Sequence, residues 1–338
     1  MVEWKKLGEV CTFNRGRTIT AKDAVDGGIP VIAGGQAPSY YHNESNREGE
    51  SITVAGSGAY AGFISYWNQP IFVSDAFTVD PKELLKHKYL FHWLKHNQSN
   101  VFATQKGAGV PHVHGKDIAN FLIPIPSLEE QTRIVGILDT FTSSIDNLKE
   151  QIAQRRKQYE YYRDQLINKS FSLFSSIFLK DVAIIKNGKD YKELGIGDIP
   201  VYGSGGIMTY VDTYASDSPS VLLPRKGSVE NIFYVEKPFW TVDTIYWTDI
   251  DCTRIIPKYL FYALSIYNLK DYAYGGARPS LSQPILYKLR IPLPPLSEQQ
   301  RIVSILDTFE ASIQNLEAQL KEREKQYEYY RNKLLTFE

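Results

Sequence analysis

The stretch SLEEQTRIVGILDTFTSSIDNLKEQIAQRRKQYEYYRDQLIN, residues 127–168, returns as PLSEQQRIVSILDTFEASIQNLEAQLKEREKQYEYYRNKLLT at residues 295–336. The two copies are offset by 168 residues without a gap, and 25 of their 42 positions are identical. Neither copy contains proline after its first residue, and Gly136 is the only glycine. A repeat of this length indicates that one structural unit occurs twice in the chain.

Apolar residues recur in both copies at alternating intervals of four and three residues. An average period of 3.5 residues is typical of a coiled-coil seam. The seam positions are Ile134, Leu138, Phe141, Ile145 and Leu148 in the first copy, and Ile302, Leu306, Phe309, Ile313 and Leu316 in the second. Roughly 40 residues in each copy predict helical rods of about 60 Å. Neither rod can bury its seam alone, so we expect the rods to pair with each other.

The connection between the rods favours an antiparallel pair. Residues 171–294 separate them, and a segment of similar length, residues 1–126, precedes the first rod. Because the linker into the second segment is short, antiparallel rods are the simpler solution. They would place the two segments at opposite ends, about a pseudo-two-fold axis, whereas parallel rods would crowd both at one end. We expect Ile145 and Ile313 to lie level with each other.

The globular segments repeat the same plan with lower identity. IPVIAGG at 29–35 corresponds to IPVYGSGG at 199–206, and HKYLFHWLK at 87–95 corresponds to PKYLFYALS at 257–265. Short alternating apolar runs between glycine, proline and asparagine predict twisted, mostly β domains with short helices. We therefore predict an α+β protein, with two such domains joined by two long helices in an antiparallel coiled coil. The expected parts are domains at 1–126 and 171–294, and helices at 127–170 and 295–338.

Composition excludes several classes of protein. The 38 Lys and Arg residues balance 38 Asp and Glu residues, which argues against tight DNA binding by the chain alone. Cys11 and Cys252 are too few for a disulfide framework or a thiolate metal site. The sequence has no apolar run of 18 residues and no signal-peptide pattern at its start, so we expect a cytoplasmic protein without a membrane span.

The run IPxPxLxEQxRIVxILD that opens each rod, the YEYYR near its end and the loop GGARPSLS at 275–282 resemble the specificity subunit of type I restriction–modification enzymes. The resemblance covers essentially the whole chain, and the tandem order of domain and helix is more specific than any single motif. It implies a non-catalytic protein with two target-recognition domains. Each would read one half of a split, asymmetric double-stranded DNA sequence, and the helices would set the spacing.

The resemblance also implies partner subunits. Two methyltransferase subunits would dock on the helices, carry the S-adenosylmethionine site and methylate adenine. Restriction subunits would join through the complex and supply ATP-driven translocation and cleavage, with Mg²⁺. No cofactor is expected on this chain, whose sequence contains no P-loop, no dinucleotide-binding fingerprint and no methyltransferase motif.

Polar residues in corresponding loops are the candidate DNA contacts, because Arg and Lys bind guanine or phosphate and Gln binds adenine. We select Gln36, Tyr40, Lys106, His112 and His114 in the first domain, and Ser204, Arg225, Lys226, Arg278 and Ser280 in the second. Each could instead brace its own loop. Asp75 and Asp243, which start or lie within the expected strands, are expected to be structural caps. Val110 stands where Arg278 stands, so the first domain must use other residues for that role.

His112 and His114 alternate along the chain and should share one face of a strand. With no third ligand nearby in the sequence, we expect no metal site there. Two other functions stay open. The chain could be a coiled-coil adaptor whose domains bind proteins or small ligands, or a hydrolase with a site in the loop GAGVPHVH at 107–114.

Overall fold

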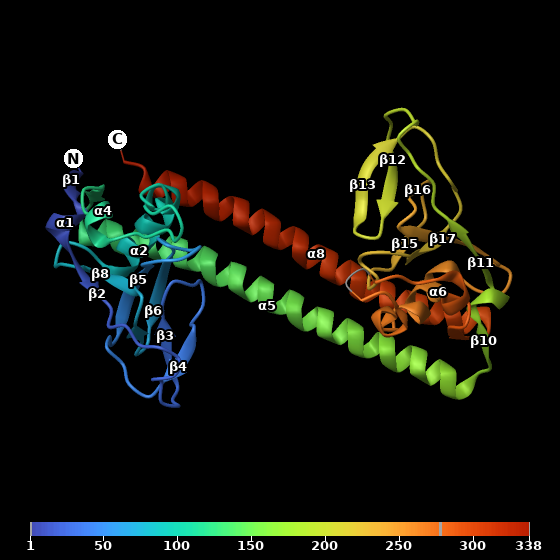
Figure 1. The fold of residues 1–338 in the computed structure, drawn as a ribbon. Helices are drawn as coiled ribbons and strands as arrows, with labels where there is room; N and C mark the ends of the chain where they lie inside the picture. The colour runs from blue at the N-terminus through green and yellow to red at the C-terminus, as the bar shows by residue number, and fades with distance from the viewer. Residues whose placement is uncertain (1, 277–278, 338) are drawn as a thin grey trace. The chain divides into compact units, whose positions relative to one another are not determined.

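The structure, a computed structural model, describes residues 2–276 and 279–337. Its internal contacts divide the chain into two compact units. Unit 1 comprises Met1–Lys149 and Ala318–Glu338, and unit 2 comprises Glu150–Glu317. The division cuts both long helices, so each unit contains one β-rich domain and a part of each helix (Figure 1).

Unit 1 contains a four-stranded antiparallel sheet in the order β2-β8-β5-β6, a three-stranded sheet β4-β3-β7 and a two-stranded ribbon β1-β9. Its strands are β1 (Glu3–Lys6), β2 (Cys11–Arg15), β3 (Ile29–Ile32), β4 (Tyr40–His42), β5 (Glu50–Ala55), β6 (Ile64–Asn68), β7 (Phe72–Val73), β8 (Ala76–Pro81) and β9 (Leu122–Ile125). Its short helices are α1 (Leu7–Val10), α2 (His87–His96), α3 (Gln98–Phe102) and α4 (Gly115–Ile118).

Unit 2 repeats this topology, with sheets β11-β17-β14-β15, β13-β12-β16 and β10-β18. Its strands are β10 (Ser176–Phe178), β11 (Ala183–Asn187), β12 (Ile199–Gly203), β13 (Gly206–Val211), β14 (Ser220–Pro224), β15 (Phe233–Val235), β16 (Trp240–Thr241), β17 (Ile245–Ile250) and β18 (Arg290–Pro292). Its short helices are η1 (Leu179–Asp181), α6 (Pro257–Leu264), η2 (Leu269–Tyr272) and α7 (Gln283–Leu286). The matching strand orders confirm the expected α+β class and the duplication.

The two long helices are α5 (Leu128–Leu173) and α8 (Leu296–Leu335), and they run antiparallel within each unit. In unit 1, Phe141 stacks on Tyr330 with ring centroids 5.3 Å apart, and Lys149 lies 3.5 Å from Glu324. Residue numbers therefore rise along α5 while they fall along α8. Ile145 lies between Phe141 and Lys149, so it faces residues 324–330. The expectation that Ile145 lies level with Ile313 is wrong. Phe141 packs against Tyr330, and each step forward along α5 is matched by a step backward along α8, so Ile313 lies further along the pair than Ile145.

Unit 2 has the same helix pairing in its own residues. Tyr162 stacks on Phe309 at 5.3 Å, and the Arg156 guanidinium lies 2.5 Å from Glu317.

Seam residues near the domains are the most buried ones, because there the helices pack against the domain as well as each other. The buried seam residues are Ile134, Leu138, Ile145, Ile302 and Leu306, and the partly buried ones are Phe141, Leu148, Phe309, Ile313 and Leu316.

A buried glutamine near the start of each long helix holds the helix to its domain. The Gln131 side chain donates to the carbonyl oxygens of Leu84 and Pro126, at 2.9 and 3.0 Å, and accepts from the Lys86 N–H at 2.9 Å. Gln299 makes the corresponding three bonds in unit 2. Both side chains are fully buried, and their bonds satisfy backbone groups at partly or fully buried positions.

About two helical turns further along, an aspartate of each long helix makes a second contact with the domain. Asp139 accepts from Lys88 at 2.6 Å and lies 2.8 Å from Nε2 of the buried His92. In unit 2, Asp307 accepts from Lys258 at 2.8 Å and from the Tyr262 hydroxyl at 2.6 Å. Corresponding aspartates therefore join α2 to α5 in unit 1 and α6 to α8 in unit 2.

Candidate nucleic-acid interface

Four segments of unit 1 meet at one end of its four-stranded sheet. Arg15 pairs with Phe77, and Ala55 pairs with Ala76, so the ends of β2 and β5 lie on either side of the start of β8. The segment before α4 closes the fourth side. Together they surround a cavity of about 480 Å³, lined by Phe13, Arg15, Gly56, Asp75, Ala76, Phe77 and residues 112–116.

His112 ties the loop of residues 106–114 to this sheet. Its backbone exchanges two hydrogen bonds with Lys106, at 2.8 and 3.0 Å, and also forms a bridge to Ser57. His112 and His114 are exposed and their rings stack with centroids 6.3 Å apart, whereas Val113 between them is fully buried. The two imidazoles thus share one face, as alternation predicts. Within residues 2–276 and 279–337, no group of three His, Cys, Asp or Glu could hold a metal ion.

The Lys106 side chain forms an ion pair with Asp117. Its ammonium group pairs with Asp117, whose side chain is only 4% exposed, and the same carboxylate accepts from the His114 N–H at 2.9 Å. Burial acts to raise the pKa of Asp117, but these hydrogen bonds and nearby positive charges outweigh it and hold the pKa below its usual value. Lys106 therefore anchors the loop that presents the two histidines.

Unit 2 builds the same frame with different side chains. Ser280 exchanges backbone hydrogen bonds of 2.8 and 3.0 Å with Tyr274 and forms a bridge to Lys226. Tyr274 therefore takes the place of Lys106, and Lys226 takes the place of Ser57. The Arg225 guanidinium donates to the backbone carbonyl of Asp243 at 3.2 Å. It also lies 5.8 Å from the centroid of the Tyr246 ring. Arg278 lies outside the residues that the structure describes.

An aspartate occupies the same corner of both frames. Asp75 accepts a hydrogen bond from the Ser57 hydroxyl, whereas Asp243 lies 3.1 Å from the Lys226 ammonium. Each contact ties the turn after one strand, β5 or β14, to the segment before its neighbour in the sheet, β8 or β17, in keeping with the structural role expected of the two aspartates. The partner is neutral in unit 1 and cationic in unit 2, so the corners differ in charge.

The remaining candidates lie in the loops after β3 and β12. Gln36 is exposed, but Tyr40 donates its hydroxyl to the Ile19 carbonyl at 2.5 Å and braces the loop. Ser204 is only 8% exposed, and its backbone bonds to the side chains of Thr244 and Asn231 at 3.2 and 2.9 Å. Burial and these two bonds fit the loop-bracing alternative for Ser204, and its role as a DNA contact stays a prediction.

The cavity also contains two cations that the loop motifs do not predict. Arg15 and Lys116 are exposed and line it. Among the described residues, neither side chain forms an ion pair. Arg15 is the last residue of β2, far in sequence from the glycine-rich loop. The repeat could have indicated Arg15 as a candidate, because it aligns Arg15 with a residue of different chemistry, Asn187, at the end of the equivalent strand.

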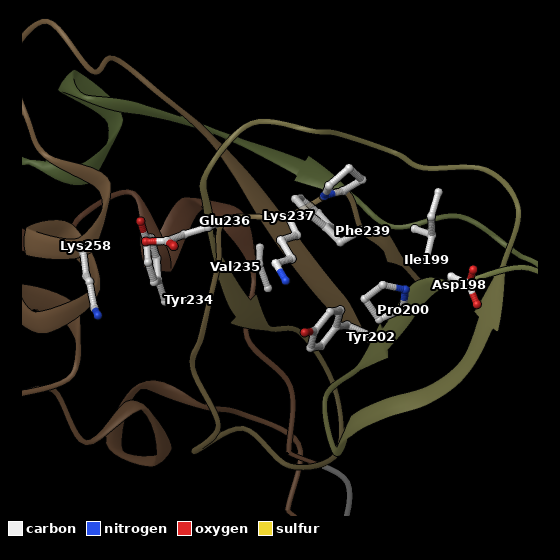
Figure 2. A pocket seen from close by; sticks show the side chains of 11 residues that line it. Asp198, Ile199, Pro200, Tyr202, Tyr234, Val235, Glu236, Lys237, Phe239 and Lys258 are labelled. Atoms are coloured by element: carbon white, nitrogen blue, oxygen red, sulfur yellow. The ribbon is translucent and has the colours of Figure 1, made fainter. Parts of the chain in front are cut away.

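Unit 2 has a cavity of its own, of about 490 Å³, between β12, β15 and α6 (Figure 2). Tyr202, Phe239 and the exposed Lys237 lie along one part of it, and Tyr234 and Lys258 along another. Lys258 lies 2.8 Å from Asp307 and 3.3 Å from Glu310 of α8, which leaves Lys237 as the lysine of this cavity that faces solvent. The described residues include no helix long and apolar enough to cross a membrane.

Comparison with known proteins gives a consistent family. The profile of the type I restriction modification DNA specificity domain matches residues 1–155 and 172–324. A putative type I restriction enzyme specificity subunit of Haemophilus influenzae is 30% identical over 375 aligned positions, covering 99% of this chain and 96% of that protein. The EcoR124I/EcoR124II specificity subunit of Escherichia coli is 27% identical over 406 positions, covering 99% and 94%.

The fold has also been seen in solved structures. The type I restriction–modification S subunit from M. genitalium superposes with a TM-score of 0.75 at 19% identity, over 100% of this chain and 97% of that one. At this identity the likeness concerns the fold, and it agrees with the duplicated arrangement of domains and long helices described above.

Proposed function

Because this chain belongs to the family of type I restriction–modification DNA specificity subunits, which recognise DNA and are not themselves catalysts, we propose that each β-rich domain reads one half of a split, asymmetric DNA target. Residues 1–126 and 171–294 are the two target-recognition domains in this proposal. Residues 127–170 and 295–338 are the helices that set the distance between the half-sites.

The observation that carries the proposal is one frame with two sets of side chains. His112, Lys106 and Ser57 in unit 1 correspond through backbone bridges to Ser280, Tyr274 and Lys226 in unit 2. A shared frame positions the reading residues alike in both domains. Different side chains in that frame present different hydrogen-bonding groups, so the two half-sites should have different sequences.

The balanced charge of the chain indicates that other subunits share the contacts to phosphate. We infer that two methyltransferase subunits dock on the long helices and that restriction subunits join the same complex. S-adenosylmethionine, ATP and Mg²⁺ belong to those partners in this proposal. The cytoplasm stays the predicted compartment.

The long helices offer matched surfaces for such partners. Tyr161 and Tyr329 are 60% and 58% exposed, and they occupy the same position of the repeated YEYYR motif. Each contacts the next tyrosine edge-on, with centroids 5.4 and 5.3 Å apart. Aromatic residues are enriched in protein interfaces, and a surface that occurs twice fits two copies of one partner.

The test is methylation of a library of randomised DNA sites by the chain in complex with its methyltransferase partner. The double variant Arg225→Ala with Lys226→Ala should change the preference at one half-site only. The double variant His112→Ala with His114→Ala should change only the other. A matched control is Lys180→Ala, an exposed lysine before the opposite end of β11. Equal changes at both half-sites in either double variant would contradict the modular reading.

A further inference from the structure

The last residue of one strand occupies the same place in both domains but carries different chemistry. Arg15 ends β2 and pairs with Phe77, and Asn187 ends β11 and pairs with Tyr246. The register is the same along both strands, because Cys11 pairs with Pro81 and Ala183 pairs with Ile250 at their other ends. Both Arg15 and Asn187 are exposed.

In unit 2 a second amide holds Asn187. The Gln283 Nε2 group, at the first position of α7, donates to Oδ1 of Asn187 at 3.4 Å. This bond directs Oδ1 toward Gln283. Among the described residues no other side-chain bond involves this amide, so its two N–H groups and the second lone pair of Oδ1 can bind a ligand. One donor beside one acceptor on a planar amide is the pattern that matches N7 and N6 of adenine in the major groove.

Unit 1 cannot use the same device. Gly115 takes the place of Gln283, and a Cβ added there would come within 2.7–2.8 Å of three atoms of the Phe13 side chain. Unit 2 has the smaller Ile185 at the position of Phe13, which leaves room for the Gln283 side chain. Packing around Phe13 therefore excludes a buttressing side chain from residue 115.

Without a side chain at residue 115 to hold it, the strand-end position of unit 1 carries an arginine, Arg15, in place of an asparagine. Arg15 lines the cavity beside His112 and His114, and its guanidinium forms no ion pair with any described residue. A planar guanidinium offers two parallel N–H donors, which match the two acceptors O6 and N7 of guanine. The same group could instead bind a phosphate, and the experiment below separates the two.

We propose that this strand-end position reads a base in both domains, with Arg15 specifying a guanine in one half-site and Asn187, positioned by Gln283, specifying an adenine in the other. The proposal rests on the function proposed above and names the residues and bases through which it works. It also makes Gly115 and Phe13 the packing pair that decides which chemistry each domain can use.

The main experiment again uses the library and the complete complex. Arg15→Ala should lower the preference for guanine at one position of its half-site by roughly 10- to 100-fold. Asn187→Ala should do the same for adenine at one position of the other half-site. Thr12→Ala and Ile184→Ala are matched controls, because these residues are exposed and equivalent within the same two strands. They should leave both half-sites unchanged.

Two further measurements identify the contacts. Placing 7-deazaguanine at the affected position removes N7, so it should impair methylation by wild type but not by Arg15→Ala. Gln283→Glu would accept from the Asn187 amide rather than donate to it and turn that amide over. It should abolish the adenine preference without lowering the melting temperature, whereas a purely structural Gln283 would predict no change in base preference.

The outcomes separate this inference from the proposed function. If Arg15→Ala weakens methylation of all sequences alike and reduces the salt dependence, Arg15 binds phosphate and the base-reading assignment is wrong. If neither strand-end variant alters a bipartite target that the Lys226 and His112 variants do alter, only this inference fails. If wild type selects no split target at all, the proposed function fails with it.

Discussion

Replacing Gln299 by methionine tests how a long helix is held to its domain. The Gln299 side chain is fully buried and makes three bonds: from the Ile256 N–H at 2.8 Å, and to the Arg254 and Pro294 carbonyls at 3.1 and 2.9 Å. Methionine has nearly the same length and volume, so the change removes these bonds without opening a large cavity.

The magnitude follows from what is left behind. One backbone N–H and two carbonyl groups lose a partner at positions that are partly or fully buried, and each such loss costs about 1–3 kcal/mol. We take roughly 3–5 kcal/mol in total, since neighbouring groups relax. For a unit of this size, each kcal/mol lowers the melting temperature by about 2–4 °C. The expected fall for unit 2 is therefore roughly 6–20 °C.

The assay is thermal unfolding followed by circular dichroism, with hydrogen exchange at the Ile256 amide as a local probe. Gln300→Met is the matched control, because Gln300 is the exposed neighbour in the same helical turn. Gln131→Met should reproduce the effect in unit 1, where the same three bonds occur. If Gln299→Met melts within about 2 °C of Gln300→Met, apolar packing alone holds the helix and the reasoning fails.

Three other predictions concern pH, spacing and assembly. Burial, together with the charges of Lys88 and Arg331, lowers the pKa of His92 despite the nearby Asp139. As pH falls, the histidine of the unfolded chain therefore becomes protonated before that of the folded chain, and unit 1 should lose stability below about pH 6.5. His92→Tyr, which copies the non-titrating Tyr262 of unit 2, should flatten the melting temperature between pH 7 and pH 5.5, and an unchanged slope would assign the effect elsewhere. Inserting one heptad in both α5 and α8 lengthens each by about 10 Å, or about three base pairs, so mapped methylation sites should keep their half-sites with a longer gap. Tyr161→Ala with Tyr329→Ala should weaken binding of the methyltransferase partner in sedimentation experiments without changing the melting temperature, whereas unaltered binding would place the docking surface elsewhere.

Much of the fold was predictable because it depends on local pattern. The 3.5-residue period predicted both long helices, and the short alternating runs between glycines predicted two β-rich domains. The level of the helices was not predictable, because a seam with the same residues in both copies fits several registers. The stacking of Phe141 on Tyr330 and of Tyr162 on Phe309 selects one register.

The candidate site was predictable only where residues are neighbours in sequence. Alternation placed His112 and His114 on one face, whereas the bridge between Lys226 and Ser280 is visible only in the structure. The burial of Ser204 could not be predicted, because burial of a loop residue depends on which other segments pack against it. Arg15 and Lys116 were missed, because their nearness to the histidines is created by strand pairing across more than 60 residues of chain.

The sequence by itself determined the duplication, the class of each element and the family, since these follow from repeat and period. The tertiary structure decided which side chains share a cavity, which charges are neutralised and which amides are held. Lys106 reads as a free cation in sequence but is paired with the nearly buried Asp117. Asn187 reads as an ordinary strand end but is held by Gln283, almost 100 residues later. Hydrogen bonds and ion pairs act over a few ångströms, so they depend on distances in space that only the folded chain defines.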